Sequence, residues 1–332
     1  MNRRQTLAAL LAISAAPLAA RAQTKGKPLR IGVLALTAPT RGPAMPSPFL
    51  LKLAALGWFD GQNCVIEPRY AEGHVDRLDA IAADHVREPA DVIVAIGPQA
   101  AVAAAKATKT IPIVFAAVNF PVELGLVASL ARPGGNLTGG TWTTGPEFYT
   151  KLLEFVKAIA PKATRIAGLS SPSALTDVSG RVFDMRPVLQ SAARQLGMEL
   201  QGFRVLNPED FQAAFADIVK WRPHALVVPG DPVTYPERKR IVDFANKNRL
   251  PGIYAATEFA VDGGLLSYSA DINDMQQLTA IYVDRVLRGA KPAELPVELP
   301  KKFEVVINLK TARTLGLRIP QSVLLRADRV IE

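Results

Sequence analysis

The sequence predicts an α/β protein of two doubly wound lobes, in which helices cover both faces of a mostly parallel sheet. Short Val-, Ile- and Ala-rich runs alternate with amphipathic helical patterns. This alternation occurs twice, as two arrays of similar size. Without its first 22 residues the chain keeps about 310 of its 332 residues, which is more than one hydrophobic core usually serves.

The first array is expected to contain four strands and four helices, because each apolar run ends at Gly, Pro or a polar residue before a helical pattern begins. The expected strands are residues 29–36, 64–70, 91–96 and 111–118, and the expected helices are residues 46–56, 74–87, 99–107 and 122–130.

The second array repeats this rhythm and is followed by a strand–helix–strand extension. Proline is well placed at the first turn of several of these helices because its φ is already helical. The expected strands are residues 165–169, 199–205, 225–229, 252–255, 265–269 and 303–309, and the expected helices are residues 147–159, 186–196, 208–221, 236–247 and 273–287.

Residues 1–22 have the pattern of an export signal. Arg3 and Arg4 precede an Ala- and Leu-rich run, and residues 20–22 (Ala-Arg-Ala) offer a cleavage site for signal peptidase. The run is too short to span a bilayer. The paired arginines fit a twin-arginine signal and an ordinary secretory signal equally well. We expect a mature chain that begins near Gln23 and is periplasmic, without a lipid anchor, because no Cys follows the run.

Charge and cysteine content exclude several classes of protein. The formal net charge is +9 and falls to +6 without Arg3, Arg4 and Arg21, and no block of five like charges occurs. Nucleic-acid binding is therefore not expected. Cys64 is the single cysteine, so an internal disulfide is impossible and the core must hold the fold.

Candidate site residues follow the strands, at the edge where ligands gather in open α/β sheets. Residues 97–100 (Gly-Pro-Gln-Ala) lead into an Ala-rich helix whose first amides form a seat for an anion or a carboxylate. A plain strand-to-helix connection is the alternative. Thr37 and Arg41 lie in a polar loop after the first strand. Further candidates at strand ends are Asn119, Phe120, Asp231 and Glu258.

Five segments that fall in order carry a resemblance to a known family. They are residues 111–115 (IPIVF), 132–139 (RPGGNLTG), 263–268 (GGLLSY), 303–312 (FEVVINLKTA) and 325–332 (LRADRVIE). Together they resemble the substrate-binding components of ABC importers, in the branch that includes tryptophan- and tyrosine-binding lipoproteins. The match covers residues 29–332.

The resemblance implies a type I periplasmic-binding-protein fold with three hinge crossings, near residues 141–144, 256–258 and 295–302. The third crossing is Pro-rich, which independently favours a stiff linker. The implied lobes are residues 28–141 with 257–295, and residues 142–256 with 296–332. The ligand is expected in the cleft, enclosed by hinge closure.

One of the site positions that the resemblance implies differs from the family's sequence. The carboxylate-binding turn matches Gly97, Gln99 and Ala100, whereas the family's Asp-Pro-Val becomes Phe-Pro-Val at residues 120–122. Phe120 cannot pair with a ligand ammonium, which favours an apolar or aromatic acid over an α-amino acid. Asp231 can supply a replacement carboxylate.

Three further positions remain open between binding and structure. Glu258 matches a family Glu and reaches either the ligand or the hinge. Tyr268 is expected on the strand nearest the cleft, as a ligand contact or a structural tyrosine. Trp142, like Phe148, lies in or just after the first crossing and either stacks on a planar ligand or packs in the core.

Catalytic machinery is not evident, so we expect no enzyme, no cofactor and no metal. His74, His85 and His224 have no metal-ligand spacing, and neither a Gly-x-Ser-x-Gly elbow nor a Gly-x-Gly-x-x-Gly loop occurs. The resemblance implies a monomeric exported protein that binds a small carboxylate-bearing molecule and delivers it to an ABC permease. A sensory binding protein that docks on a membrane receptor is the alternative.

Overall fold

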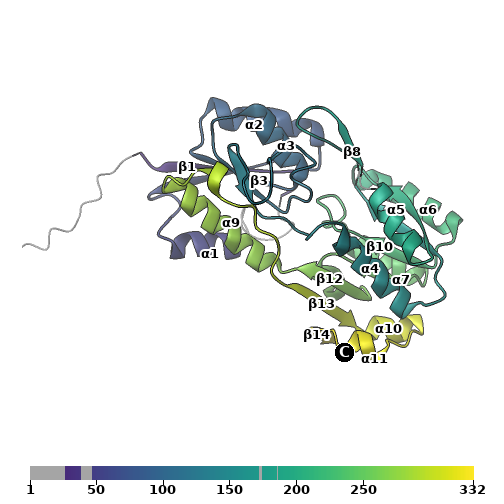
Figure 1. Cartoon of the computed structure of the whole chain (residues 1–332). Coiled ribbons are helices and arrows are strands. Elements are labelled where there is room, and N and C mark those ends of the chain that lie inside the picture. Colours follow the sequence, from purple (N-terminus) through teal and green to yellow (C-terminus); the bar gives the residue numbers. More distant parts are fainter. Residues whose placement is uncertain (1–26, 39–46, 172–173, 185) are drawn as a thin grey trace, which may run out of the picture.

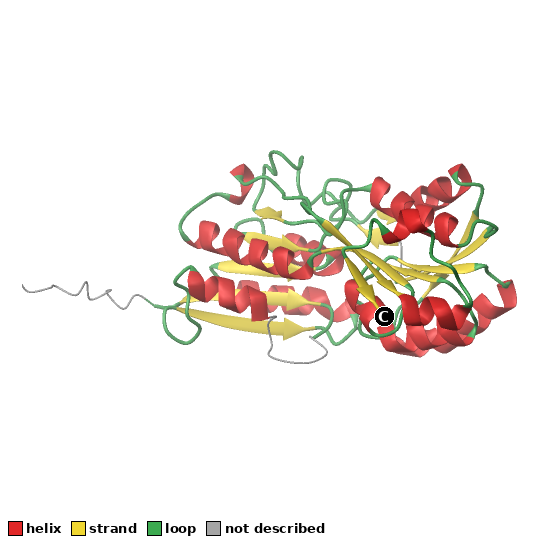
Figure 2. Cartoon of the chain, turned by 90° about the horizontal axis from the view of Figure 1, so that it is seen from below, coloured by secondary structure: helices red, strands yellow, loops and turns green. Residues whose placement is uncertain are grey.

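The computed structural model describes residues 27–38, 47–171, 174–184 and 186–332 (Figures 1 and 2). The expected signal, residues 1–22, and the loop that contains Arg41 lie outside the described residues. Two lobes lie side by side, each built around its own sheet (Figure 2). The predicted fold class, two α/β lobes, is confirmed.

The first lobe has a five-stranded parallel sheet in the order β2-β1-β3-β4-β5. Helices α2 and α3 pack together over one face, and α1 and α9 over the other (Figure 1). The strands are β1 (Leu29–Ala35), β2 (Cys64–Tyr70), β3 (Val92–Ile96), β4 (Ile113–Ala116) and β5 (Leu137–Gly139), and the helices are α1 (Ser47–Ala55), α2 (Leu78–Arg87), α3 (Pro98–Ala107) and α9 (Ile272–Leu287).

The second lobe has a seven-stranded sheet in the order β14-β13-β12-β11-β10-β6-β9, in which the β12–β13 pair is antiparallel. Its strands are β6 (Arg165–Ser170), β9 (Glu199–Arg204), β10 (Ala225–Val228), β11 (Gly252–Tyr254), β12 (Leu266–Ala270), β13 (Phe303–Asn308) and β14 (Arg329–Ile331). Its helices are α4 (Pro146–Ile159), α5 (Arg186–Gln195), α6 (Phe211–Trp221), α7 (Arg238–Lys247), α8 (Thr257–Val261), α10 (Leu309–Leu315) and α11 (Gln321–Leu324).

Two segments of chain run side by side between the lobes. One follows β5, and the other follows a short 3-10 helix, Pro292–Glu294, and leads into β13. The amide of Thr141 donates to the carbonyl of Glu298 at 3.0 Å, and the amide of Glu298 donates to the carbonyl of Gly139 at 3.0 Å. These hydrogen bonds make the two connections a narrow ribbon instead of two independent strands.

The expected second crossing at residues 256–258 is wrong. Strand β12 pairs with β11 and β13, so the chain is still in the second sheet at Ala270. It returns to the first lobe at Asp271, the N-cap of α9. The part of 257–295 that belongs with the first lobe therefore begins about fourteen residues later than expected. Hydropathy alone does not show which of two sheets a buried strand joins.

Two local predictions also differ from the structure. The helix expected over residues 122–130 is a series of turns, in which the amides of Leu126 and Val127 both donate to the carbonyl of Pro121. An unexpected antiparallel hairpin, β7 (Ala174–Thr176) and β8 (Val182–Asp184), follows β6. Short strands with few flanking residues give too little periodicity to be recognised.

A buried histidine packs in the first lobe against a glycine of β1. His85 on α2 is 1% exposed, and a Cβ built on Gly32 would lie 2.6 Å from its Nδ1. The Nε2 of His85 lies 3.3 Å from the carbonyl oxygen of Val33. Burial lowers the pKa of the imidazole, and the hydrogen bond to Val33 opposes this only in part. The folded state therefore favours the neutral imidazole of His85 over the charged form.

Because the folded-state pKa of His85 is lowered, its contribution to stability is complete above the unfolded value of about 6.5 and decreases as the pH falls below it. We expect the free energy of unfolding, measured by urea titration, to be smaller at pH 5.5 than at pH 7.5. His85→Gln cannot titrate and should lose less between the two pH values, although it should be about 1–2 kcal/mol less stable at pH 7.5. Equal losses in both proteins would contradict this assignment.

Candidate ligand-binding site between the lobes

The N-terminus of α3 faces the second lobe. Gly97 is its N-cap, with φ of +85°, and the Gly97 carbonyl accepts from the amide of Ala101. Pro98 has no amide, and the amides of Gln99 and Ala100 have no acceptor inside the helix because they belong to its first turn. These two amides can bind an anionic group.

A loop of the second lobe approaches this helix N-terminus. A Cβ built on Gly97 would lie 3.4 Å from Cγ of Pro232, in the loop after β10. Asp231, the preceding residue, uses both carboxylate oxygens within its own lobe. It accepts from the amides of Ser171 at 2.8 Å and Val233 at 2.9 Å. Asp231 thus holds the loop in place and has less capacity for a ligand ammonium.

The side chain of Gln99 is incompletely bonded. Its Oε1 is buried, and it has no hydrogen-bond partner among the residues that the structure describes. The same atom lies 3.9 Å from the Cβ position built on Gly97, so it is next to the turn. Since an unpaired buried polar atom costs free energy, Gln99 is placed to hydrogen-bond a molecule that enters here.

Asn119 connects three segments at the end of β4. Its Oδ1 accepts from the amides of Trp142 at 3.2 Å and Thr143 at 3.0 Å, in the connection between the lobes. Its Nδ2 donates to the hydroxyl of Tyr149 on α4 at 3.4 Å. Trp142 in turn donates from Nε1 to the carbonyl of Ala255 at 3.2 Å. The connection is therefore tied to both lobes.

Phe120 follows Asn119 with a φ of +57°, an uncommon conformation for an aromatic residue. Its ring lies parallel to that of Tyr149, with 6.3 Å between centroids and 12° between planes. Burial raises the pKa of the Tyr149 hydroxyl, and the negative charge of Asp231 raises it further. Phe120 thus presents an apolar first-lobe surface against the second lobe.

The hairpin β7–β8 forms a clasp between the lobes, which we define as residues 177–181. The amide of Val178 donates to the carbonyl of Leu124 in the first lobe at 3.2 Å. A Cβ built on Gly125 would lie 2.8 Å from Cγ2 of Val178. The buried Asp177 carboxylate accepts from the amides of Ser179 and Arg181, which fixes the turn.

Most of the expected site residues lie around this contact between lobes: Gly97, Gln99, Ala100, Asn119, Phe120, Trp142 and Asp231. Tyr268 does not; its ring stacks on Phe148 and Phe303 at 5.3 and 5.1 Å, in the aromatic cluster beneath α4. This packing favours the interpretation of Tyr268 as a structural tyrosine over that of a ligand contact. Phe148 is 1% exposed and packs in the same core.

The two other expected residues, Glu258 and Thr37, each follow a strand, one in the second lobe and one in the first. Glu258 is in the first turn of α8. Burial raises the pKa of the Tyr235 hydroxyl, and the negative charge of Glu258 raises it further. Thr37 is partly exposed at the end of the first strand segment. Sequence reasoning missed Tyr149, Pro232 and the clasp. Tyr149 lies on the apolar face of an ordinary helical pattern, so no sequence signal distinguishes it from core.

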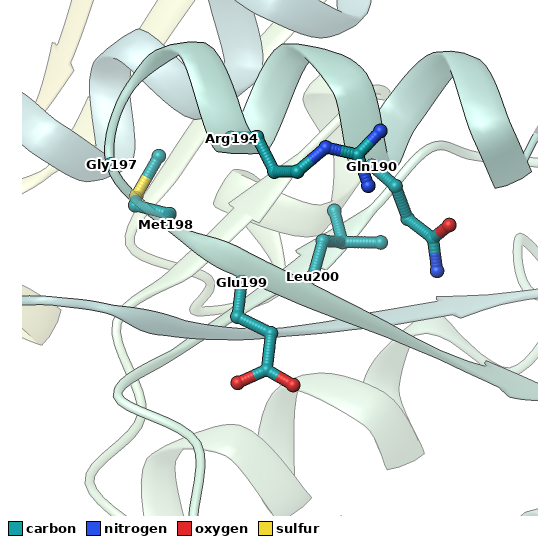
Figure 3. A pocket seen from close by; sticks show the side chains of 6 residues that line it. All are labelled: Gln190, Arg194, Gly197, Met198, Glu199 and Leu200. Carbon is teal, nitrogen blue, oxygen red and sulfur yellow. The ribbon is translucent and has the colours of Figure 1, made fainter.

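Two open hollows lie elsewhere, along the edge strand β9. One, of about 490 Å³, is lined by Gln190 and Arg194 of α5 and by Glu199 and Leu200 of β9 (Figure 3). The other, of about 540 Å³, adjoins Trp221 of α6. Neither contains a residue of the contact between lobes. Within the described residues no cluster of His, Cys, Asp or Glu is placed to hold a metal, and no helix there is long and apolar enough to cross a bilayer.

We expect Gly125→Ala to open the clasp. The new methyl group would meet Val178, and the left-handed backbone (φ +68°) adds about 1 kcal/mol of strain. Gly197→Ala is a matched control, because Gly197 has a φ of +70° and nothing within 4 Å of its Cβ position. Small-angle X-ray scattering should show a larger radius of gyration for Gly125→Ala alone, and Val178→Ala should reverse it. A radius equal to that of the control would refute the clasp.

Comparisons with known proteins agree on one family. The model described as ABC transporter substrate binding protein matches residues 43–331. The Tyrosine-binding protein of Clostridioides difficile (strain R20291) is 30% identical over 271 residues, which cover 81% of this chain and 76% of that protein.

Solved structures support the same assignment. A conserved domain protein from Vibrio cholerae is 30% identical, with a TM-score of 0.81, and the match covers 92% of this chain and all of that one. The ABC domain from Streptococcus pneumonia in complex with L-Trp is 29% identical, with a TM-score of 0.79 and the same coverage. The chain therefore belongs to the ABC transporter substrate-binding protein family and has the type I periplasmic-binding-protein fold.

Proposed function

We propose that this protein is an exported solute-binding protein that captures a small carboxylate-bearing molecule with an apolar or aromatic body and delivers it to an ABC permease. The observation that carries the proposal is a set of polar groups without hydrogen-bond partners, where the N-terminus of α3 meets the second lobe. The amides of Gln99 and Ala100 have no acceptor inside α3, and the buried Oε1 of Gln99 has no hydrogen-bond partner among the described residues, beside the loop of Pro232. A carboxylate with a neighbouring donor would satisfy them.

The body of the ligand is proposed from the side chains near these amides. Phe120 and Tyr149 offer ring faces and edges, which suit an aromatic or apolar group. Relatives bind aromatic amino acids by name: the Clostridioides difficile relative is a tyrosine-binding protein, and the Streptococcus pneumonia structure contains L-Trp. These names support an aromatic body for the ligand of this chain.

The α-amino group is where this chain departs from that pattern. Phe120 carries no charge, and Asp231 already accepts backbone amides with both carboxylate oxygens. Removing these hydrogen bonds to bind an ammonium would leave buried donors unpaired. The proposed ligand is therefore an acid without an α-amino group.

Ligand-driven closure is the proposed signal to the transporter. The closed lobes share the clasp and the contact of Gly97 with Pro232, so a ligand that bridges them shifts the population toward this state. A monomer in the periplasm suffices for this role. A sensory protein would use the same closed state, and the family match to transporter components favours import.

The expected ligand class can be tested by thermal-shift screening of residues 23–332 against aromatic acids, dicarboxylates, α-amino acids and sugars. At a concentration of about 100 times Kd, a ligand adds about 2.7 kcal/mol to stability, or several degrees to Tm. We expect hits among carboxylates that carry a neighbouring donor other than an amine, and Gln99→Ala should weaken them about tenfold. Hits confined to sugars would contradict the proposal that the amides of Gln99 and Ala100 bind a carboxylate.

Two substitutions separate the role of Phe120 from that of the amides of Gln99 and Ala100. Phe120→Asp and Phe120→Asn both remove the ring and both tolerate the positive φ better than Phe, but only Asp adds a charge. We expect Phe120→Asp to gain at least tenfold in preference for an α-amino acid over its deaminated acid, relative to Phe120→Asn, in calorimetric titrations. The same preference in both variants would show that this position does not meet the amino group.

A further inference from the structure

Positive charge is concentrated at the C-terminal end of the chain. Residues 301–332 contain seven basic and three acidic residues, whereas residues 22–300 contain 29 basic and 27 acidic residues. Four of the six net positive charges of residues 22–332 therefore lie in the last 32 residues. Charge this uneven creates a local potential that the overall net charge does not reveal.

The fold gathers this segment at one edge of the second lobe. Strand β14 is the edge strand, beside β13, and α10 and α11 form the crossover between them (Figure 1). We call this surface the basic edge. Its basic residues, all exposed, are Lys301, Lys302, Lys310, Arg313, Arg318, Arg326 and Arg329.

Acidic side chains do little to neutralise the basic edge. Lys302 pairs with Asp328 at 3.0 Å, and no other carboxylate pair of the edge is recorded among the residues that the structure describes. Glu304 accepts from Thr257 at 3.1 Å, and together with Asp328 its charge acts on Lys302, whose pKa the acidic groups raise. The remaining cations are therefore available to an anionic surface.

An apolar side chain projects from the same surface. Leu325 is 77% exposed, more than any other large hydrophobic residue recorded in the described part of the chain, and Val330 nearby is 40% exposed. The neighbouring guanidinium of Arg326 lies over the ring of Phe155, 4.6 Å from its centroid. Cations around a projecting apolar residue are typical of surfaces that bind anionic head groups and insert one side chain into the interface.

We propose that the basic edge binds an anionic lipid surface, reversibly and independently of the captured ligand. A lipid surface fits better than an acidic protein, because an acidic protein would need only the cations, whereas Leu325, 77% exposed beside Arg326, adds an apolar side chain that can enter the membrane interface. Such binding would hold the exported protein near the membrane without a covalent anchor. It would also weaken as salt screens the charges.

The test uses residues 23–332 and sedimentation with vesicles of phosphatidylcholine, with or without 30% phosphatidylglycerol, at low ionic strength. We expect partitioning onto the anionic vesicles only, and its loss at high salt. The variant Lys310→Gln/Arg313→Gln/Arg318→Gln should bind at least tenfold more weakly, since each basic residue near an anionic leaflet is worth about fivefold. Leu325→Ala should bind severalfold more weakly.

Matched controls remove the same groups elsewhere in the same lobe. Lys220→Gln/Lys239→Gln/Lys247→Gln also removes three exposed charges, and Leu206→Ala removes an exposed leucine; both should bind like the wild type. Equal loss in the control triple variant would show attraction by net charge alone and overturn the proposal. So would equal binding to neutral vesicles, or retention on immobilised poly-glutamate with no binding to anionic vesicles, which would indicate an acidic protein partner.

Discussion

The hydrogen bonds of the Asn119 side chain join the three segments on which the arrangement of the lobes depends. Its Oδ1 accepts from Trp142 and Thr143 in the connection that leaves the first sheet, and its Nδ2 donates to Tyr149 of the second lobe. One amide thus fixes where the chain leaves the first lobe and how α4 begins. Because these donors and acceptors are largely buried, their loss would cost more than the hydrogen bonds alone.

The remaining contacts between the lobes follow from this geometry. With the connection fixed, the carboxyl end of β3 faces the loop after β10, and the N-terminus of α3 meets Pro232. The clasp adds a contact farther along the same face, where Val178 bonds to Leu124. Closure therefore depends on a few short-range contacts between the lobes, an arrangement that a ligand can stabilise by bridging both lobes.

Polar groups at the contact between lobes divide into satisfied and unsatisfied sets. The side chains of Asp231 and Asn119 hydrogen-bond to protein partners and maintain the loops. Gln99 retains an unbonded buried oxygen next to free helix amides. This difference separates the residues that build the site from those left to bind a ligand, and residue identity alone does not show it, since an Asp or Asn at a strand end can serve either purpose.

The sequence by itself determined the fold class, most strand positions and the turn at Gly97, because these depend on local periodicity and on one residue that tolerates positive φ. It also placed Asn119 and Asp231 at strand ends. Only the tertiary structure decided which sheet β12 joins, that Tyr268 packs beneath α4, and that Asp231 bonds to its own lobe. These outcomes depend on pairing between segments far apart in the chain, and local patterns do not encode which of several compatible partners a strand or a carboxylate meets.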